Sequence, residues 1–489
     1  MNNEARVTQD SWRYLFSPAS VAVIGASNTA GSWGNNAMKG LLNTAGNRLV
    51  YPVNPNSAEV LGRKAYRSVV DIPDPVDLVV IVVAEKLVPD VLRECVSKGV
   101  KAAVIITAGF GETGEPGRKL EAELAEIARQ GGIRFIGPNS MGHADTRTQL
   151  STFGQSGEMP RGPVAVLAQS GNMCLKIVRN LAESGVAFSK YISTGNEADV
   201  RMEDYLEYLA KDDDTKIIAA YIEGLRDGRR FFRLAKEITV RKPIVVVKTG
   251  GTQESAKAVM SHTGALAGAD TVYTAAFKQS GVIRVEDDDE LCDVVYALLN
   301  SPLPRSNRVG ILSIGGGPGA MTAEACEKEG LAIATLEPST ISKLDKYLPS
   351  RWPRRNPVDM AGPSAAEFSI IADLLWALIE DKNLDFIFLL APIVMDRALL
   401  ASRMGLSPEA IKAYRAKEEK NMMLIGEKVG KYEKPVVTMW QWRSSNSDPD
   451  MASLLHKAKV LVCANGRRAA RVLRYLVWYR QYLDATTGK

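Results

Sequence analysis

The sequence predicts three doubly wound α/β domains, and three observations support this fold class. The chain has 489 residues, enough for three domains at about 150 residues each. Short runs of β-branched residues alternate throughout with longer segments of helical period, a pattern typical of parallel sheets covered by helices. A strand-like run is followed three times by a glycine-bearing turn, at residues 25–27, 169–171 and 315–317.

The strand-like runs fall into three series. They occupy residues 21–24, 78–83, 103–106 and 134–136, then 164–167, 217–221 and 244–247, and finally 309–314, 386–390 and 435–437. Short apolar runs of this kind are typical of strands buried on both faces of a parallel sheet. Segments 88–98 and 118–130 have helical period. Gly- and Pro-rich residues at 151–163 and 301–307 separate the series, so we place the domains at 1–150, 151–300 and 301–489.

Composition and charge exclude several classes of protein. The chain has 61 Lys and Arg residues against 56 Asp and Glu residues. This excess of positive charge is too small to indicate a nucleic-acid-binding protein. The apolar run at 78–84 is too short to span a membrane, and charges interrupt the N-terminus where a signal peptide needs an apolar stretch. Five scattered cysteines without a CxxC pair argue against disulfides and against a structural metal site. We expect a cytoplasmic protein.

The C-terminal segment predicts a basic amphipathic helix. Apolar residues recur at helical spacing over 467–483, with arginines between them. Such a helix can contact a membrane or a partner. We favour a helix packed on the last domain.

The first glycine turn predicts a ligand that carries phosphate groups. Residues 21–28 end a strand in a turn, and Gly31 and Gly34 precede a helix. Backbone N–H groups and a helix N-terminus can meet phosphate oxygens there, because no Cβ blocks the approach. The spacing is not that of the dinucleotide fingerprint, and Asn54 stands where an acid would bind a ribose hydroxyl. A phosphate-rich ligand other than NAD is therefore favoured, with a turn that binds no ligand as the alternative.

His262 is a candidate nucleophile. It lies among small residues at 261–268, where its imidazole would be accessible. Glu223 directly follows a strand, where the sites of α/β proteins are built, and a carboxylate there can fix the tautomer of an imidazole. Turns at 170–172 and 316–319 each begin a helix and can offer amides to a phosphoryl oxygen. A histidine without a catalytic role, a solvated acid and ordinary turns are the alternatives.

Ordered motifs over almost the whole chain resemble a known family. They include SVAVIGASNTAGSWG, VYPVNPN, AVIITAGFGE, IGPNSMG, VAVLAQSGN, STGNEADV, YIEG, SHTGALAG, ILSIGGGPGAMTAEAC and NPVDMAG. In this order they resemble the CoA-binding α subunit of the nucleoside-diphosphate-forming acyl-CoA synthetases, the superfamily of ADP-forming acetate–CoA ligase and succinyl-CoA synthetase. The resemblance implies a Rossmann-like CoA-binding domain followed by two flavodoxin-like domains. It also implies an ADP-forming acid–CoA ligase, which converts ATP, a carboxylic acid and CoA to ADP, phosphate and acyl-CoA.

The resemblance also implies roles for individual residues. His262 would carry phosphate as a phosphohistidine, and Glu223 would orient it. Two helix N-termini would stabilise the phosphate, at Ser170, Gly171 and Asn172 and at Gly317, Pro318 and Gly319. The CoA contacts would be Gly25, Ser27, Asn28, Ser32, Asn54, Val83, Ala84, Thr107 and Asn139. The loops around Gly362, Pro392 and Ile393 would hold the acid.

The resemblance further implies a partner. Three α/β domains account for the length of the chain and leave no room for the family's ATP-grasp module. We therefore expect ATP and ADP, with Mg²⁺, to bind a separate ATP-grasp β subunit in an α₂β₂ heterotetramer. The substrate would be a small carboxylic acid, whose identity the sequence leaves open. A non-catalytic regulator that binds CoA or acyl-CoA on the same scaffold is the alternative, although such a protein would need neither His262 nor Glu223.

The glycine turn generates a first prediction. Titration of the chain with CoA in a calorimeter should show binding, whereas NAD should bind little, because Asn54 offers no carboxylate to a ribose hydroxyl. A preference for NAD over CoA would contradict this interpretation of the turn.

Overall fold

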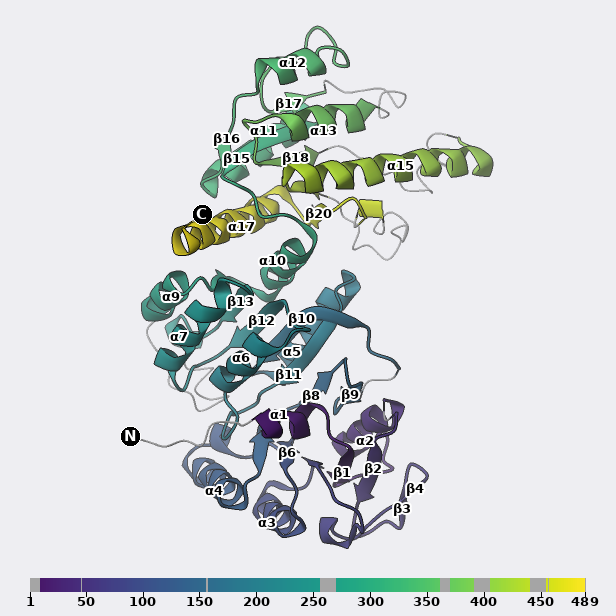
Figure 1. Cartoon of the computed structure of the whole chain (residues 1–489), viewed down its shortest axis with the longest axis vertical. Coiled ribbons are helices and arrows are strands. Elements are labelled where there is room, and N and C mark those ends of the chain that lie inside the picture. The colour runs from purple at the N-terminus through teal and green to yellow at the C-terminus, as the bar shows by residue number, and fades with distance from the viewer. Residues whose placement is uncertain are drawn as a thin grey trace. The chain divides into compact units, whose positions relative to one another are not determined.

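The computed structural model describes residues 9–44, 46–154, 157–255, 270–360, 370–390, 405–439, 454–455 and 457–488 (Figure 1). These residues form two compact units, Met1–Cys292 and Asp293–Lys489. Two of the three large sheets lie in the first unit and the third lies in the second. The predicted α/β class is confirmed, since all three sheets are largely parallel.

The first sheet is entirely parallel and has the order β2-β1-β5-β6-β7. Its strands are β1 (Ser20–Ile24), β2 (Leu49–Val53), β5 (Leu78–Ile81), β6 (Ala102–Ile105) and β7 (Arg134–Ile136). A short hairpin, β3 (Glu59–Val60) and β4 (Arg63–Lys64), lies beside it as a separate sheet.

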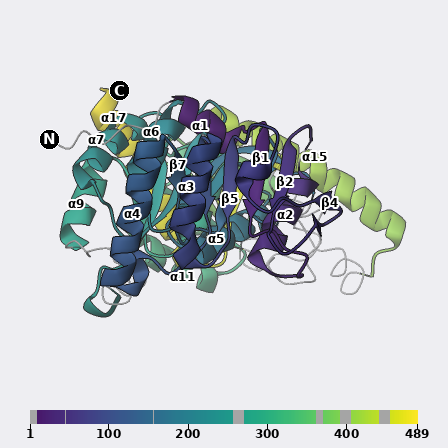
Figure 2. The ribbon, with the colours of Figure 1, turned by 90° about the horizontal axis from the view of Figure 1, so that it is seen from below.

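Helices cover both faces of this sheet. Alternate residues of each strand point to opposite sides, so each face has its own apolar core. On one face, Val21 and Val23 share a core with α1 (Gln9–Phe16) and α2 (Trp33–Asn43). On the other face, Ala22 and Ile24 share a core with α3 (Val88–Lys98) and α4 (Glu115–Gly131). Figure 2 shows α3 and α4 side by side. The first sheet is therefore doubly wound, as the sequence predicted.

The second sheet has the order β14-β13-β12-β10-β11-β8-β9. Its strands are β8 (Gly142–Asp145), β9 (Leu150–Ser151), β10 (Arg161–Ala168), β11 (Phe188–Ser193), β12 (Ile217–Ile222), β13 (Ile244–Lys248) and β14 (Ile283–Val285). Its helices include α5 (Gly171–Glu183), α6 (Met202–Lys211), α7 (Gly228–Thr239), α9 (Asp270–Gln279) and α10 (Asp288–Asn300). The strands from β10 to β14 pair in parallel, whereas β8 is antiparallel to β11 and to β9.

The predicted boundary at residue 150 falls within this second sheet. The hairpin of β8 and β9 spans 142–151 and pairs with β11, so the second sheet begins before the Gly- and Pro-rich segment. Strands this short carry no continuous apolar run, so the sequence did not predict this hairpin; the domain bounds 1–150, 151–300 and 301–489 stay predictions. The chain divides into its two compact units at 292–293, within α10.

The second unit contains a sheet of order β16-β15-β18-β19-β20, with β17 paired to β15. The strands are β15 (Arg308–Ser313), β16 (Ala332–Ile333), β17 (Val358–Asp359), β18 (Phe386–Leu390), β19 (Val436–Met439) and β20 (Val460–Cys463). Its helices are α11 (Gly316–Lys328), α12 (Pro338–Leu344), α13 (Ile371–Glu380), α15 (Pro408–Tyr432) and α17 (Gly466–Thr487).

The C-terminal helix packs on its own unit. In α17 the apolar face is buried, including Val472, Leu473 and Leu476, and the helix contacts α11, β19 and β20. This confirms the expected packing on the last domain. Of the helices that the structure describes, none combines the length and apolar character needed to cross a bilayer.

A buried ion cluster lies in the second sheet, next to α1. The ammonium of Lys190 in β11 is fully buried and lies 3.3 Å from Asp145 Oδ2 and 2.9 Å from Asp212 Oδ2. The ring of Phe16 in α1 lies 5.9 Å from the same ammonium. Burial by itself would raise the pKa of Asp212. Hydrogen bonds from Thr215 and Lys190 outweigh burial and hold that pKa below its usual value.

Replacing Lys190 should destabilise the first unit. In Lys190→Met the carboxylates of Asp145 and Asp212 stay buried without their cation, at a cost of about 3–5 kcal/mol. Urea unfolding measures the loss. The control is Lys211→Met, because that side chain is 71% exposed and its removal should cost within about 0.5 kcal/mol. Equal unfolding midpoints for the two variants would contradict the proposed role of the cluster.

Candidate functional site

A cavity of about 360 Å³ lies at the carboxyl ends of strands from both sheets of the first unit. Its lining follows β5, β6, β7 and β10 and comprises Trp33, Val82, Val83, Ile106, Thr107, Ala108, Asn139, Ser140, Met141, Gln169, Ser170, Gly171 and Asn172. It therefore brings together three predicted CoA contacts and the three residues predicted to begin a phosphate-stabilising helix. The carboxyl ends of parallel strands are where α/β proteins bind ligands.

Hydrogen bonds hold the three predicted CoA contacts on this cavity together. Thr107 Oγ1 donates to the carbonyl of Val83 at 2.7 Å, and the backbone N–H of Asn139 donates to the carbonyl of Thr107 at 2.9 Å. The side-chain amide of Asn139 donates to Asn196 Oδ1 at 3.2 Å. This chain of bonds joins loops of the first sheet to a loop of the second.

The N-terminus of α5 forms one wall of the cavity. Ser170 is the N-cap, and its hydroxyl accepts a hydrogen bond from the N–H of Met173 at 3.5 Å. A Cβ on Gly171 would lie 2.3 Å from Cγ of Met141, so a larger residue there would displace the Met141 side chain from the cavity wall. The free N–H groups of a first helical turn, together with the helix dipole, favour an anion at this wall.

The first glycine turn packs closely against the end of β5 and against the start of α2. A Cβ on Gly25, which has a φ of +93°, would lie 2.2 Å from the carbonyl oxygen of Val82. A Cβ on Gly34 would lie 2.0 Å from the carbonyl oxygen of Gly25. Ser32 is the N-cap of α2, and its hydroxyl accepts from the N–H of Asn35 at 3.3 Å.

The remaining predicted CoA contacts do not line the cavity. Two of their side chains support the turn itself: Asn54 donates to the carbonyl of Ala26 at 2.8 Å, and Asn28 bonds the backbone of Glu59 and Leu61. Ser27 accepts from the N–H of Thr29 at 3.0 Å. These residues, with Gly25 and the N-cap Ser32, form or support the turn next to the cavity, and Ala84 directly follows Val83 in the chain.

Glu223 directly follows β12 at the same edge of the second sheet and is 4% exposed. Its backbone N–H donates to Gln169 Oε1 at 2.5 Å, and its carbonyl accepts from Lys248 Nζ at 2.8 Å. His262, Gly362, Pro392 and Ile393 lie outside the described residues. Gly317, Pro318 and Gly319 form the first turn of α11 in the second unit, after the N-cap Gly315.

Three polar residues were not singled out from the sequence: Gln169 and Lys248, which bond to Glu223, and Glu197, which bonds to Gln169. Burial lowers the pKa of Lys248 to about 8, and the charge of Arg284 adds to the effect. Burial, and then the charge of Glu203, raise the pKa of Glu197 to about 7. Gln169 makes three hydrogen bonds to the backbone of Glu223 and Gly224. A polar residue at the end of a strand, or directly after it, was the only signal in the sequence for Lys248 and Gln169.

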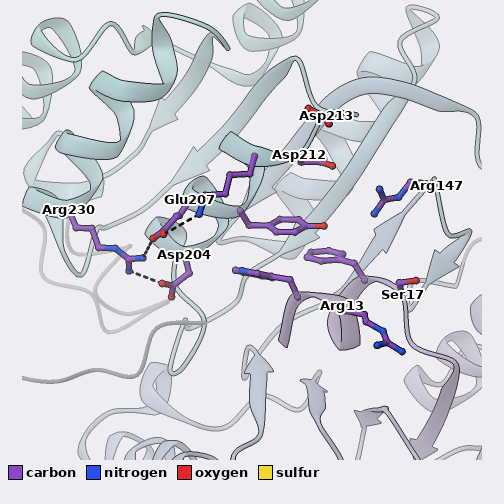
Figure 3. Close-up of a pocket in the computed structure, with 12 residues that line it drawn as sticks. Arg13, Ser17, Arg147, Asp204, Glu207, Asp212, Asp213 and Arg230 are labelled. Carbon is purple, nitrogen blue, oxygen red and sulfur yellow. Dashed lines mark hydrogen bonds and ion pairs between the residues drawn. The ribbon is translucent and has the colours of Figure 1, made fainter. Parts of the chain in front are cut away.

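A second cavity in the first unit, of about 460 Å³, contains none of the predicted site residues (Figure 3). Its aromatic wall is packed on itself, since Phe16 and Tyr208 stack with centroids 5.0 Å apart and Trp12 stacks on Tyr208 at 4.7 Å. Arg230 is paired with Asp204 at 2.7 Å and with Glu207 at 2.8 Å. The aromatic rings and charged groups that a ligand would contact are therefore largely engaged with one another.

Within the described ranges, no group of three or more His, Cys, Asp or Glu side chains is placed to hold a metal ion.

Comparisons with known proteins show what the chain is similar to. Residues 19–145 match a family model described as a CoA binding domain, and residues 161–298 match one described as a succinyl-CoA ligase like flavodoxin domain. The α subunit of ADP-forming acetate–CoA ligase II of Pyrococcus furiosus is 45% identical over 376 residues, which cover 76% of this chain and 81% of that protein. The ADP-forming acetate–CoA ligase I of Archaeoglobus fulgidus is 44% identical over 373 residues, which cover 76% of this chain but 54% of that protein.

Two solved structures resemble the chain over nearly its whole length. A crystallised protein of Pyrococcus horikoshii is 36% identical, with a TM-score of 0.78 and coverage of 96% of this chain and 99% of that one. The dinucleotide forming acetyl-coenzyme A synthetase 1 of Ca. Korarchaeum cryptofilum, in complex with phosphate and ADP, is 28% identical, with a TM-score of 0.80 and coverage of 97% and 98%.

The raised pKa of Glu197 predicts how stability depends on pH. The carboxyl titrates near 4.5 when the chain is unfolded but only near pH 7 when it is folded. Between these values the folded state binds more protons, so this group lowers the stability as the pH rises through the window. Glu197→Gln should remove that slope and be more stable than the parent at pH 8 by about 1–3 kcal/mol.

Urea unfolding at pH 5 and pH 8 measures this effect. Glu183→Gln is the control, because its side chain is 66% exposed and should leave the slope unchanged. The same pH slope in Glu197→Gln and the parent would contradict the assignment.

Proposed function

The chain belongs to the family of α subunits of ADP-forming acetate–CoA ligases, and from this premise we propose that it makes acyl-CoA through a phosphohistidine at His262. The observation that carries the proposal is the cavity at the carboxyl ends of β5, β6, β7 and β10. There, Thr107 and Asn139 of the predicted CoA site share one space with the N-terminus of α5, which favours an anion.

CoA would approach from the first glycine turn. Gly25 and Gly34 let the turn pack closely against the end of β5 and the start of α2. The first N–H groups of α2, which begins after the N-cap Ser32, can then meet phosphate oxygens. The cavity lies next to this turn, because Trp33, the first residue of α2, is part of its wall. A thiol held in the cavity would then lie beside Ser170 and Asn172, where a phosphoryl group can be stabilised.

Glu223 would act on His262 rather than on the substrate. A carboxylate that accepts a hydrogen bond from one ring nitrogen fixes the tautomer and leaves the other nitrogen free to attack phosphorus. Glu223 meets the requirement for a fixed position, since it is 4% exposed and its backbone is bonded on both sides. The helix N-termini at Ser170 and at Gly317–Gly319 would offset the charge of the phosphohistidine.

ATP would be bound by a partner. Two relatives are named as subunits α, and a relative named without a subunit is matched over only 54% of its length. We infer a separate ATP-grasp β subunit, in an α₂β₂ assembly, that binds ADP or ATP with Mg²⁺. The acid is proposed to be a small carboxylic acid held by the loops around Gly362, Pro392 and Ile393.

The reverse half-reaction tests the proposal on the full chain alone. With acetyl-CoA and ³²P-phosphate, phosphate displaces CoA from the thioester to give acetyl phosphate, and the histidine then takes the phosphoryl group and releases acetate. The chain should acquire acid-labile label, and His262→Asn should acquire none, because the nucleophile is gone. Glu223→Gln should be labelled about 10²–10⁴-fold more slowly. His456→Asn is the histidine control and should keep the label.

Two outcomes separate this proposal from the regulator. A chain that binds CoA but takes no label from acetyl-CoA and phosphate, and none from ATP with its partner, would be a CoA-binding regulator. Label that persists in His262→Asn would contradict the phosphohistidine. Calorimetry with CoA should give the same affinity for both variants and the parent, which shows that any loss of label is not a loss of binding.

A further inference from the structure

We propose that Gln169 and Lys248 are positioning residues that together fix Glu223 relative to the N-terminus of α5. The inference rests on the proposed role of Glu223. It adds two residues to the machinery of phosphoryl transfer, one from each of the strands that flank β12.

The sheet order puts these residues on either side of Glu223. Strand β12 lies between β10 and β13, and all three are parallel. Ala168 pairs with Tyr221 on one side, and Lys248 pairs with Ile222 on the other. Gln169 directly follows β10, and Lys248 is the last residue of β13. Both therefore lie level with the end of β12, which Glu223 directly follows.

The two side chains satisfy every backbone polar group of Glu223 and Gly224. Gln169 Oε1 accepts from the N–H of Glu223 at 2.5 Å and from that of Gly224 at 3.0 Å. Gln169 Nε2 donates to the carbonyl of Gly224 at 2.8 Å, and Lys248 Nζ donates to the carbonyl of Glu223 at 2.8 Å. The hydrogen bonds between the strands end at this level, so these side-chain bonds pair backbone groups that the sheet itself leaves unpaired and fix the position of Glu223.

Gln169 also connects Glu223 to the phosphate-binding helix. It is the residue before Ser170, the N-cap of α5, and it lines the same cavity. A shift of the Glu223 loop would therefore change the distance between the orienting carboxylate and the amides of α5. A misplacement of about 1 Å can cost about 10²-fold in rate.

Contacts on several sides fix the side chain of Lys248. Its side chain also donates to the carbonyl of Thr249, and its ammonium lies 4.4 Å from the centroid of the Tyr273 ring. The charged groups that act on it are Arg284 of β14, Asp270 of α9 and Glu223, and Arg284 and Asp270 are paired at 2.5 Å. Burial lowers the pKa of Lys248 to about 8, so the ammonium becomes a neutral and weaker donor at mildly alkaline pH.

The variants Gln169→Leu and Lys248→Met test the proposal in the acetyl-CoA and phosphate labelling assay. Each should lower the first-order rate of labelling by about 10–10³-fold, with the affinity for CoA unchanged within about twofold. Gln169→Glu retains the acceptor and loses the donor, so an intermediate rate is expected, and it decides the question if Gln169→Leu does not fold. Matched controls are Gln130→Leu and Lys211→Met, which alter exposed helix positions.

The pH profile separates positioning from mere stability. The parent should lose labelling rate as the pH rises through about 8, because Lys248 is deprotonated, and Lys248→Met should lack this alkaline limb. A purely structural role would instead lower the melting temperature and leave the rate per folded molecule and its pH profile unchanged.

Parent-like labelling by folded Gln169→Leu and Lys248→Met would overturn the inference while leaving the proposed function intact. Absence of label in the parent, both from acetyl-CoA with phosphate and from ATP with its partner, would overturn the proposed function, and the inference with it.

Discussion

The site depends on one constraint, which is that parallel strands bring their carboxyl ends to the same edge of a sheet. In the second sheet this places Gln169, Glu223 and Lys248 at consecutive strand ends, although they are far apart in the chain. In the first sheet it places Val83, Thr107 and Asn139 on one cavity. Neither edge forms the cavity alone, because Ser170–Asn172 from the second sheet complete its wall.

The two edges must therefore be held together, and α1 with the β8–β9 hairpin does this. Apolar residues of α1, β1 and α6 belong to one continuous core. His143 in β8 is fully buried, and its Nε2 lies 2.6 Å from the carbonyl oxygen of Leu15. Burial lowers the pKa of His143 to about 4, so this histidine stays neutral near neutral pH and acts in packing. The buried ammonium of Lys190 in the second sheet contacts the same helix, since it lies 5.9 Å from the centroid of the Phe16 ring in α1.

Much of the architecture was predictable from the sequence because buried parallel strands are apolar and continuous. The residues 134–136 and 386–390 and the helix 88–98 have the predicted bounds as β7, β18 and α3. The hairpin of β8 and β9 was missed, since Gly142–Asp145 has no apolar run. The strand end at Glu223 was predictable, but the roles of Gln169 and Lys248 were not. Side-chain bonds to a neighbouring backbone leave no periodicity in the sequence, and they become visible only when the order of the strands is known.

A crystal structure of the chain with CoA tests the central claim most directly, which is that one cavity joins the CoA site to the phosphate-stabilising helix. The account predicts phosphate oxygens of CoA against the turn at Ser27–Ser32 and the thiol in the cavity between Thr107, Asn139 and Ser170. A thiol far from the N-terminus of α5, or CoA bound instead in the aromatic-walled cavity of Trp12 and Tyr208, would contradict it.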